Sequence, residues 1–482
     1  MRLVSTLLVG VLASTAAFAA PTQQPSAALL VRRQSTSTNS TGNSTSILLP
    51  PSLDPFYSFP NLSRKTPNGA ILRSRTVSTE LDDLANGTWQ VLYKTTAADG
   101  TADATVATLF RPLEPVQPPR VMLYLAPTDT AAPDCVTSFS LSSPSLSSVS
   151  SPSALIEISA ALEKGWYVSL PDHEGSKAAF ISGVTEARAG LDGLRAALRW
   201  MDRESEGSYK GYKAVIRGYS GGGHAAAWAT QYLETYGRGL NVVGTAAGGV
   251  PVDLYPTFDL ISGTNNTALA FSAVAGLANV SPSLSTWLSS HLYPNGTAAL
   301  AYARNNSYCL DATNSTDEYP WAGNDVYSFF EGGERALYEG VPARVLRENT
   351  LGVANNRTGS SGVWPSIPIF LFHSKTDETV SYSPVKPYFR SQCSHPSVQV
   401  HLSTVSGYTH VETFAAYLAD SFEFMDSAFN GTATMKGCES SNGPKYELLG
   451  EEYVEIVGTA AVGRILSLAA TASNAGGARM RL

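Results

Sequence analysis

The sequence has few charged residues for its length and no excess of positive charge. Asp, Glu, Lys and Arg make up 15% of the 482 residues, and the formal net charge is −7. Recognition of nucleic-acid phosphates needs a basic surface, so we expect no nucleic-acid partner. Because 43% of the residues are hydrophobic, the composition is not typical of a disordered chain. We predict a compact protein, either one large domain with an insertion or two domains.

Cysteine is also scarce, with four residues in the chain: Cys135, Cys309, Cys393 and Cys438. Their spacing matches no zinc motif, and none has the local sequence of a catalytic cysteine. We therefore expect no metal and no cofactor. Four cysteines allow three pairings into two disulfides, and two disulfides suit an oxidising, extracellular compartment.

Long apolar runs are missing after the N-terminus, so we expect no transmembrane anchor. Met1-Arg2, an apolar run over 7–13 and small residues over 17–20 predict a secretory signal peptide at residues 1–20. Residues 21–49 are a candidate propeptide and disordered N-terminal segment, rich in Ser, Thr and Asn. The pair Arg32-Arg33 within it is either a processing site or two exposed charges.

Glycosylation sequons support the prediction that the protein is secreted and extracellular. Five of them lie between residues 265 and 314, which predicts exposed surface there. The eleven acceptor residues are Asn39, Asn43, Asn61, Asn86, Asn265, Asn279, Asn295, Asn305, Asn314, Asn356 and Asn430.

Short apolar runs alternate with helical patterns along most of the chain. This alternation predicts an α/β fold with a mostly parallel sheet flanked by helices. We expect strands at 88–95, 105–110, 120–125, 166–170, 212–217, 367–372 and 398–402, and helices at 154–163 and from about Lys177 to Glu204.

Residues 254–346 interrupt the alternation with a helical pattern. Apolar residues repeat there at helical spacing, for example Phe271, Val274 and Leu277. Such stripes either pack the insertion onto the main domain or cover a substrate cleft. We predict a catalytic domain at 50–253 and 347–440, a helical cap or lid at 254–346 and a C-terminal extension at 441–482.

The segment Gly218-Tyr219-Ser220-Gly221-Gly222-Gly223 lies between a predicted strand and a predicted helix. Strand, G-x-S-x-G and helix together are typical of a nucleophile elbow, in which a sharp turn exposes the serine hydroxyl. Glycine-rich turns at this position are also common as plain structure. The elbow hypothesis makes Ser220 a candidate nucleophile.

A serine nucleophile needs a base and an acid that orients the base. His410 follows the strand at 398–402 and precedes a helix, although a histidine there can be a surface residue. Asp377 follows the strand at 367–372, where ligands bind in open α/β sheets, although it can also be a turn or cap residue. Glu378 is its closest rival. The chain order Ser220, Asp377, His410 is that of α/β-hydrolases.

The tetrahedral oxyanion of acyl transfer needs aligned N–H donors. The backbone N–H of Gly221, which follows the nucleophile, is the first candidate. The second donor should come from the loop after the strand at 120–125. That loop begins Ala126-Pro127-Thr128-Asp129 and lacks a glycine-rich oxyanion motif, so composition leaves the second donor open.

Four motifs together make the chain resemble the fungal secretory lipases. They are 129–135 (DTAAPDC), 172–180 (DHEGSKAAF), 218–224 (GYSGGGH) and Asp377 with His410. The resemblance covers roughly residues 55–438. It departs from the family at Gly223, where the family commonly has alanine.

The resemblance implies an α/β-hydrolase with an inserted cap that acts as a triacylglycerol lipase or broad esterase on a lipid or ester, including lipid at an oil–water interface. It implies Ser220, Asp377 and His410 as the catalytic triad. It places the oxyanion hole at Gly221 and Asp129, and it implies disulfides Cys135–Cys309 and Cys393–Cys438.

Three other functions stay open on the sequence. An acyltransferase uses the same acyl-enzyme with an alcohol as acceptor, and a serine peptidase uses the same residues on an amide. A catalytically silent, hydrolase-like binding protein is the non-enzyme alternative. Oligomeric state and acyl-chain preference cannot be predicted from the residues.

Overall fold

The computed structural model describes residues 48–60, 62, 65–142, 152–204, 211–306, 309, 319–354, 361–433, 435 and 437–474. The predicted signal peptide at 1–20 and the Arg32-Arg33 pair lie outside the described residues. So do the sequons at Asn39, Asn43, Asn61, Asn314 and Asn356. The described residues form one compact unit, so the predicted division into catalytic domain and cap stays a prediction.

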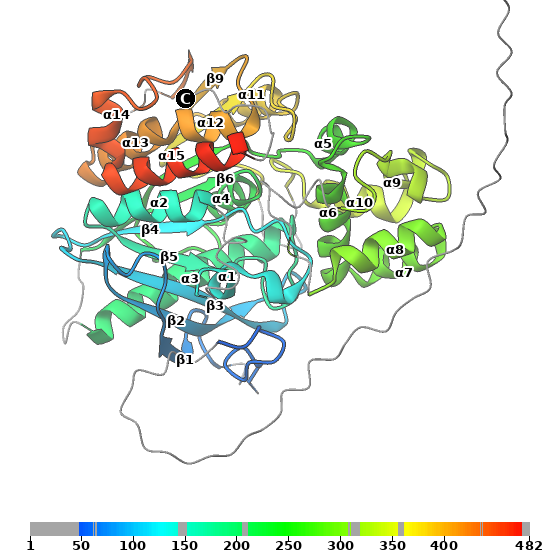
Figure 1. Cartoon of the computed structure of the whole chain (residues 1–482), viewed down its shortest axis with the longest axis horizontal. Helices are drawn as coiled ribbons and strands as arrows, with labels where there is room; N and C mark the ends of the chain where they lie inside the picture. Colours follow the sequence, from blue (N-terminus) through cyan, green and yellow to red (C-terminus); the bar gives the residue numbers. More distant parts are fainter. Residues whose placement is uncertain are drawn as a thin grey trace, which may run out of the picture. The chain divides into compact units, whose positions relative to one another are not determined.

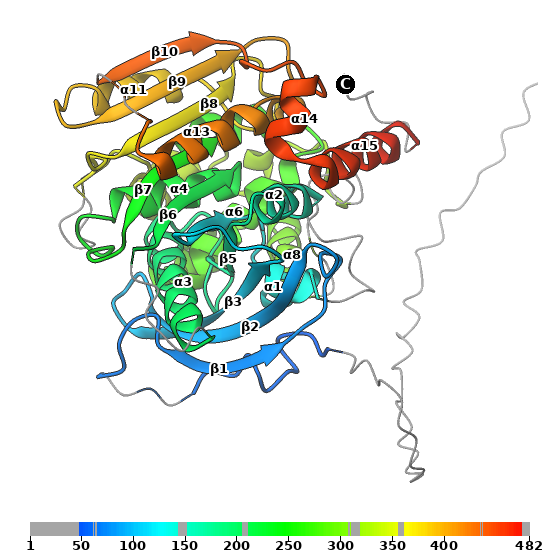
Figure 2. The same cartoon turned by 90° about the vertical axis from the view of Figure 1, so that its left-hand side faces the viewer.

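A ten-stranded sheet lies at the centre of this unit, in the order β1-β2-β3-β5-β4-β6-β7-β8-β9-β10 (Figure 2). Strands β1, β2, β3 and β5 pair antiparallel, and every pairing from β5 to β10 is parallel. The predicted mostly parallel sheet is therefore confirmed. The strands are β1 (Ile71–Thr76), β2 (Ala85–Thr96), β3 (Ala102–Pro112), β4 (Arg120–Leu125), β5 (Tyr167–Pro171), β6 (Lys213–Tyr219), β7 (Val242–Gly248), β8 (Pro368–Ser374), β9 (Gln399–Val405) and β10 (Cys438–Asn442).

Helices cover both faces of the sheet, and each face has its own apolar core. One face packs against α3 (Gly183–Glu204), α4 (Gly221–Gln231) and α11 (Val385–Gln392). The other packs against α2 (Pro152–Glu163), α12 (His410–Ala416), α13 (Leu418–Asn430), α14 (Glu451–Val457) and α15 (Thr459–Asn474). The first part of the chain adds η1 (Pro133–Cys135) and α1 (Thr137–Ser140).

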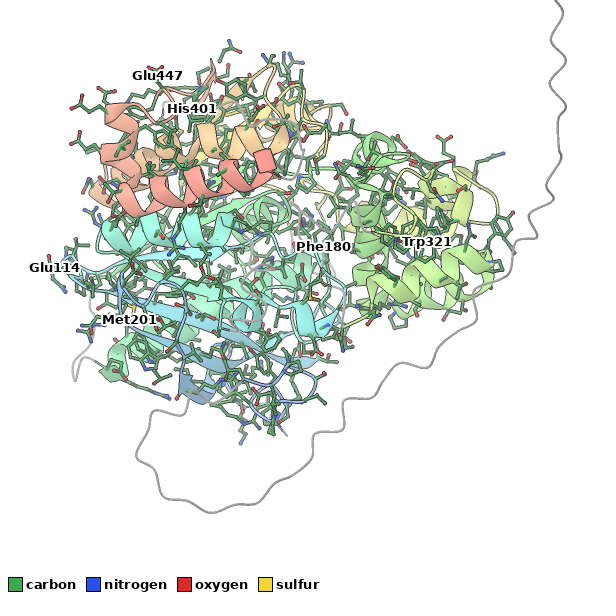
Figure 3. The ribbon with its side chains drawn as sticks, viewed as in Figure 1. Glu114, Phe180, Met201, Trp321, His401 and Glu447 are labelled. Atoms are coloured by element: carbon green, nitrogen blue, oxygen red, sulfur yellow. A yellow bond between two sulfur atoms is a disulfide. The ribbon has the colours of Figure 1, made fainter. Side chains whose placement is uncertain are left out.

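The inserted segment forms a third apolar core beside the sheet layers (Figure 1). Phe271, Val274 and Leu277 lie in this core, so the stripe seen in the sequence is buried. Phe180 joins the same core from the main domain, and Figure 3 labels it where the two parts meet. The elements are α5 (Leu254–Ile261), α6 (Thr267–Val280), α7 (Pro282–His291), α8 (Pro294–Ala303), η2 (Val326–Phe329), α9 (Arg335–Tyr338) and α10 (Gly340–Glu348).

Residues after 441 pack into the main domain. Tyr453, Val457 and Ile465 are fully buried in the same core as α2. The Tyr453 hydroxyl donates to the carbonyl of Ala415 at 2.7 Å. We therefore propose that the segment predicted as a C-terminal extension belongs to the catalytic domain as far as it is described.

The predicted helix from Lys177 is wrong at its start, because α3 begins at Gly183. Residues before it form turns, and Ala178 and Ile181 have positive φ angles of 46° and 64°. That conformation is incompatible with a right-handed helix and unusual for a branched residue. Glu186 holds it in place, because its carboxylate accepts the N–H of Ile181 at 2.7 Å.

Both disulfides that the resemblance implied are confirmed. Cys135–Cys309 joins the loop after β4 to the segment after α8, and Cys393–Cys438 joins the end of α11 to the start of β10. Where the chain is described, no single helix has the length and apolar composition to cross a membrane. Only the sharply bent pair Glu451–Val457 and Thr459–Ala470 meets these criteria when its two helices are taken together.

A buried ion pair lies beneath the central strand. Arg217 of β6 and Glu157 of α2 are fully buried, and their closest charged atoms, Nη2 and Oε1, are 2.6 Å apart. The guanidinium also lies over the ring of Phe372, 5.3 Å from its centroid. Removing one partner of such a pair leaves an uncompensated charge in the core.

We expect Glu157→Ala to lower the free energy of unfolding by about 3–5 kcal/mol, because it leaves the Arg217 cation buried and unpaired. The double variant Glu157→Leu with Arg217→Met replaces the pair by apolar groups and should recover most of that loss. Guanidinium unfolding followed by fluorescence measures both. Equal destabilisation of the single and double variants would contradict the electrostatic explanation.

Candidate active site

Ser220 sits on a sharp turn between β6 and α4. Its φ and ψ are 58° and −127°, a conformation that is strained for a residue with a side chain. The backbone holds it from both sides: Ser220 N–H donates to Gly248 O, and His224 N–H donates to Ser220 O, each at 3.0 Å. This strand–turn–helix geometry is that of a nucleophile elbow.

Glycine is required around Ser220 because the backbones approach closely. A Cβ on Gly218 would overlap the carbonyl of Gly222, and a Cβ on Gly222 would overlap the carbonyl oxygen of Leu125 at the end of β4. A Cβ on Gly223 would lie 2.5 Å from Gly248 O, so the alanine common in the family does not fit this backbone unchanged.

Asp377 and His410 are brought together by two loops at the ends of neighbouring strands. Asp377 follows β8, and His410 is the first residue of α12, after β9. The His410 Nδ1 lies 2.7 Å from Asp377 Oδ2. The other carboxylate oxygen of Asp377 accepts the N–H groups of Thr379 at 2.9 Å and Val380 at 2.8 Å. The carboxylate is therefore fixed and faces one imidazole nitrogen.

The electrostatics of this pair favour charge separation. Burial lowers the pKa of His410, but the charge and hydrogen bond of Asp377, with Glu378 and Asp129, outweigh it, and the net pKa is raised above 6.5. Burial raises the pKa of Asp377, but His410 outweighs it and the net pKa is lowered. A carboxylate that stabilises an imidazolium is what general-base catalysis by histidine requires.

Glu378, the rival acid, takes a different position. Its two carboxylate oxygens accept the backbone N–H of His410 at 3.0 and 3.3 Å. Glu378 thus caps the first turn of α12 and places negative charge at the helix N-terminus, where it is favourable. Of the two candidate acids, Asp377 is the one whose side chain contacts the imidazole.

Two further residues hold the pair, and no sequence motif points to either. The Tyr219 hydroxyl donates to His410 O at 2.6 Å, and the two rings pack with centroids 4.8 Å apart. This places the imidazole against the residue before Ser220. His373 is buried, which lowers its pKa and favours the neutral ring, and its Nε2–H donates to Val380 O at 3.1 Å.

Asp129 lies beside Gly221 in a conformation with φ of 52°. Its Oδ1 is buried without a hydrogen-bond partner among the described residues and occupies the space where a Cβ on Gly221 would be. Burial, with a smaller contribution from Glu186, raises the pKa of Asp129 to about 7 against the opposing charge of His410. The residue that the resemblance pairs with Gly221 therefore adjoins it in space.

A cavity opens at Ser220 with about 420 Å³ of atom-free space, part of it open to solvent. Its polar end is formed by Asp129, Ser220 and Gly221. Apolar side chains form most of the rest and come from the main domain and from α5 and α6 of the insertion: Phe180, Ile181, Pro251, Leu254, Phe258, Ile261, Leu269, Ala273 and Val380, with Thr257 and Thr379 beside them. An apolar chain with one polar, reactive group fits such a site.

The loop at 172–175, part of the motif at 172–180, is buried. Asp172 accepts hydrogen bonds from the N–H of Ser138 at 2.9 Å and from its hydroxyl at 2.6 Å. Burial nevertheless raises the pKa of Asp172 to about 7. Within the part of the chain that is described, no group of three His, Cys, Asp or Glu residues is placed to hold a metal ion.

We expect Gly222→Ala to prevent formation of the native elbow, because the new Cβ meets the rigid backbone of β4. The measurement is the yield of folded protein and its thermal midpoint. Gly463→Ala in α15 is the matched control, because a Cβ at Gly463 would meet no described neighbour within 4 Å. Alanine in a helix interior stabilises the fold by about 0.5–1 kcal/mol relative to glycine. A Gly222→Ala protein as stable as wild type would contradict the close packing.

Comparison with known proteins identifies the family of this chain. The family model for secretory lipases matches residues 141–437. Lipase A of Moesziomyces aphidis is 32% identical over 80% of this chain and 81% of its own length. A secreted triacylglycerol lipase of Malassezia globosa is 30% identical over 85% of this chain and 89% of its own.

Among solved structures, the closed state of Candida antarctica lipase A is similar, with a TM-score of 0.77 and 29% identity over 87% of this chain and 96% of that one. A cell-wall-degrading esterase of Xanthomonas oryzae, at 18% identity and a TM-score of 0.56, shares the fold. Sequence and structure agree that this chain belongs to the secretory lipase family and has the α/β-hydrolase fold.

Proposed function

We propose that this chain is a secreted serine lipase or carboxylesterase that hydrolyses acylglycerols and related esters through an acyl-enzyme. The observation that carries the proposal is the Asp377–His410 pair, at 2.7 Å, whose imidazole packs against Tyr219, the residue before a strained serine that lines an apolar cavity. Relatives named secreted triacylglycerol lipases support both the substrate class and the extracellular location.

In the proposed reaction, Ser220 Oγ attacks the ester carbonyl while its proton passes to His410 Nε2. The tetrahedral intermediate carries the negative charge on the former carbonyl oxygen. The backbone N–H groups of Gly221 and Asp129 would donate hydrogen bonds to it. His410 then gives its proton to the leaving alcohol, and the carbon–oxygen bond to that alcohol breaks. Water then attacks the acyl-enzyme by the same steps, and the carboxylic acid and free Ser220 are released.

The positions of the described side chains support this proposed chemistry. Asp377 keeps the Nδ1–H tautomer of His410, so Nε2 is free to take a proton. The apolar side chains from α5 and α6 would hold the acyl chain away from water and so strengthen the electrostatic interactions at its carbonyl. Positioning of this kind accounts for a large part of the rate in acyl transfer.

We expect Ser220→Ala to reduce the hydrolysis of p-nitrophenyl esters and emulsified triacylglycerol by at least about 10³-fold, because no acyl-enzyme can form. A fluorophosphonate probe should label wild type at Ser220 and leave the variant unlabelled. The thermal midpoint is the control for folding. A folded variant that keeps wild-type activity would sink the proposal.

The pH profile should depend on Asp129. Hydrolysis needs neutral His410, so activity falls as the pH drops through its raised pKa. Above the Asp129 pKa of about 7, a carboxylate forms beside the developing oxyanion and should oppose it. We therefore expect wild-type kcat/KM to decline above about pH 7.

Asp129→Asn keeps the size of the side chain and removes its charge, so its kcat/KM should hold between about pH 7 and 9. The removed charge also contributed to raising the His410 pKa, so the acid side of the profile should move to slightly lower pH. Initial rates across this range, with protein stability checked at each pH, measure both effects. If kcat/KM of the variant declined above about pH 7 as it does in wild type, the role of the Asp129 charge would be contradicted.

A further inference from the structure

Helix α6 lies across the loops that surround Ser220. At its N-terminus, Asn266 Nδ2 donates to Thr379 Oγ1 at 3.1 Å, two residues beyond Asp377. Near its C-terminal end, Gly276 packs on the backbone of Phe180, where a Cβ would lie 2.6 Å from the nitrogen and 3.0 Å from Cα. The helix therefore directly contacts the loop that follows Asp377 and the loop that contains the cavity-lining residue Phe180.

Asn279, one turn further along α6, is bonded at both ends of its side-chain amide. Its Nδ2 donates to the carbonyls of Lys177 at 2.9 Å, Ala131 at 3.1 Å and Ala178 at 3.3 Å. Its Oδ1 accepts from Arg304 Nε at 2.9 Å. One amide thus joins α6 to two separate loops of the main domain.

These two loops carry residues of the cavity. Ala131 lies two residues after Asp129, and Ala178 lies two residues before Phe180. Asp129 and Ala178 both have positive φ angles, 52° and 46°, which cost energy and persist only where neighbours hold them. The Nδ2 hydrogen bonds are placed to hold both strained segments.

Asn279 also begins a glycosylation sequon, Asn279-Val280-Ser281. A glycan is attached through the same Nδ2 nitrogen, where a sugar replaces one hydrogen. In the folded protein this nitrogen faces three carbonyl oxygens within 3.3 Å, so a sugar and these contacts cannot coexist. The sequon residues Asn86 and Asn295, in contrast, are exposed.

We propose that Asn279 carries no glycan in the folded protein and is instead a positioning residue for the loops that hold Asp129 and Phe180. Sugar transfer precedes folding, so chains modified at Asn279 would lack the native contacts and be depleted from the folded, secreted fraction. The proposed positioning role of Asn279 rests on the proposed ester hydrolysis, whereas the proposed absence of a glycan is independent of it.

The first experiment maps glycopeptides of wild-type protein secreted from a glycosylating yeast. Mass spectrometry after enzymatic removal of N-glycans in heavy-oxygen water marks each occupied asparagine. We expect the Asn279 peptide to be unmarked and peptides with Asn86 or Asn295 to be marked. A glycan at Asn279 in the folded fraction would overturn the proposal, whatever the ester-hydrolysis result.

The second experiment separates the amide from the sequon. Asn279→Asp keeps Oδ1 for Arg304 but replaces the donor by an acceptor that faces three carbonyls. Asn279→Ala is the milder companion, since it removes the donors without bringing a charge. Ser281→Asp is the matched control: it destroys the sequon, keeps Asn279, and retains an N-cap for α7, because aspartate caps as well as serine.

We expect both Asn279 variants to lose about tenfold or more in kcat for a short p-nitrophenyl ester at low temperature, with a smaller change in KM. Ser281→Asp should match wild type in both constants. A purely structural role would lower the thermal midpoint and leave kcat of the folded fraction unchanged, and that result would overturn the positioning role. If wild type hydrolyses no ester, the proposed function fails and the glycopeptide map still decides the occupancy of Asn279.

Discussion

The strained backbone of Ser220 is the constraint on which the rest of the site depends. A φ of 58° persists in a serine only where the surroundings leave no alternative. Here the surroundings are backbone atoms: Gly218, Gly222 and Gly223 let β4, β7 and α4 approach within contact of the turn. The parallel sheet fixes those strands, so the position of the hydroxyl is a consequence of the core and not of the loop.

Three carboxylates around His410 determine the electrostatics of the site. Asp377 is held by two backbone N–H groups and by His410, and Glu378 caps the helix that His410 begins. Both carboxylates therefore position His410: Asp377 contacts its Nδ1, and Glu378 accepts its backbone N–H. Asp129 Oδ1 has no hydrogen-bond partner among the described residues, and burial raises its pKa against the charge of His410, whereas the pKa of Asp377 is lowered.

Much of the fold could be predicted from sequence because buried parallel strands are short apolar runs, and the elbow combined four glycines with a strand and a helix. The acid–base pair could be predicted because both residues follow strands. The start of α3 could not, because nothing in the sequence signals a positive φ at Ile181. Tyr219 and His373 were also missed: Tyr219 contacts a residue distant in sequence, and no motif marks the contact of His373 with Val380. The catalytic roles themselves stay predictions.

The insertion is best understood as part of the active site and not only as its cover. Helices α5 and α6 supply most of the apolar wall of the cavity, and the three loops of the main domain that surround Ser220 are each in contact with α6. The disulfide Cys135–Cys309 adds a covalent link between the same regions. A shift of α6 would break the hydrogen bonds of Asn279 to the strained loops that carry Asp129 and Phe180. An opening of the site that preserves its geometry would therefore leave α6 in place.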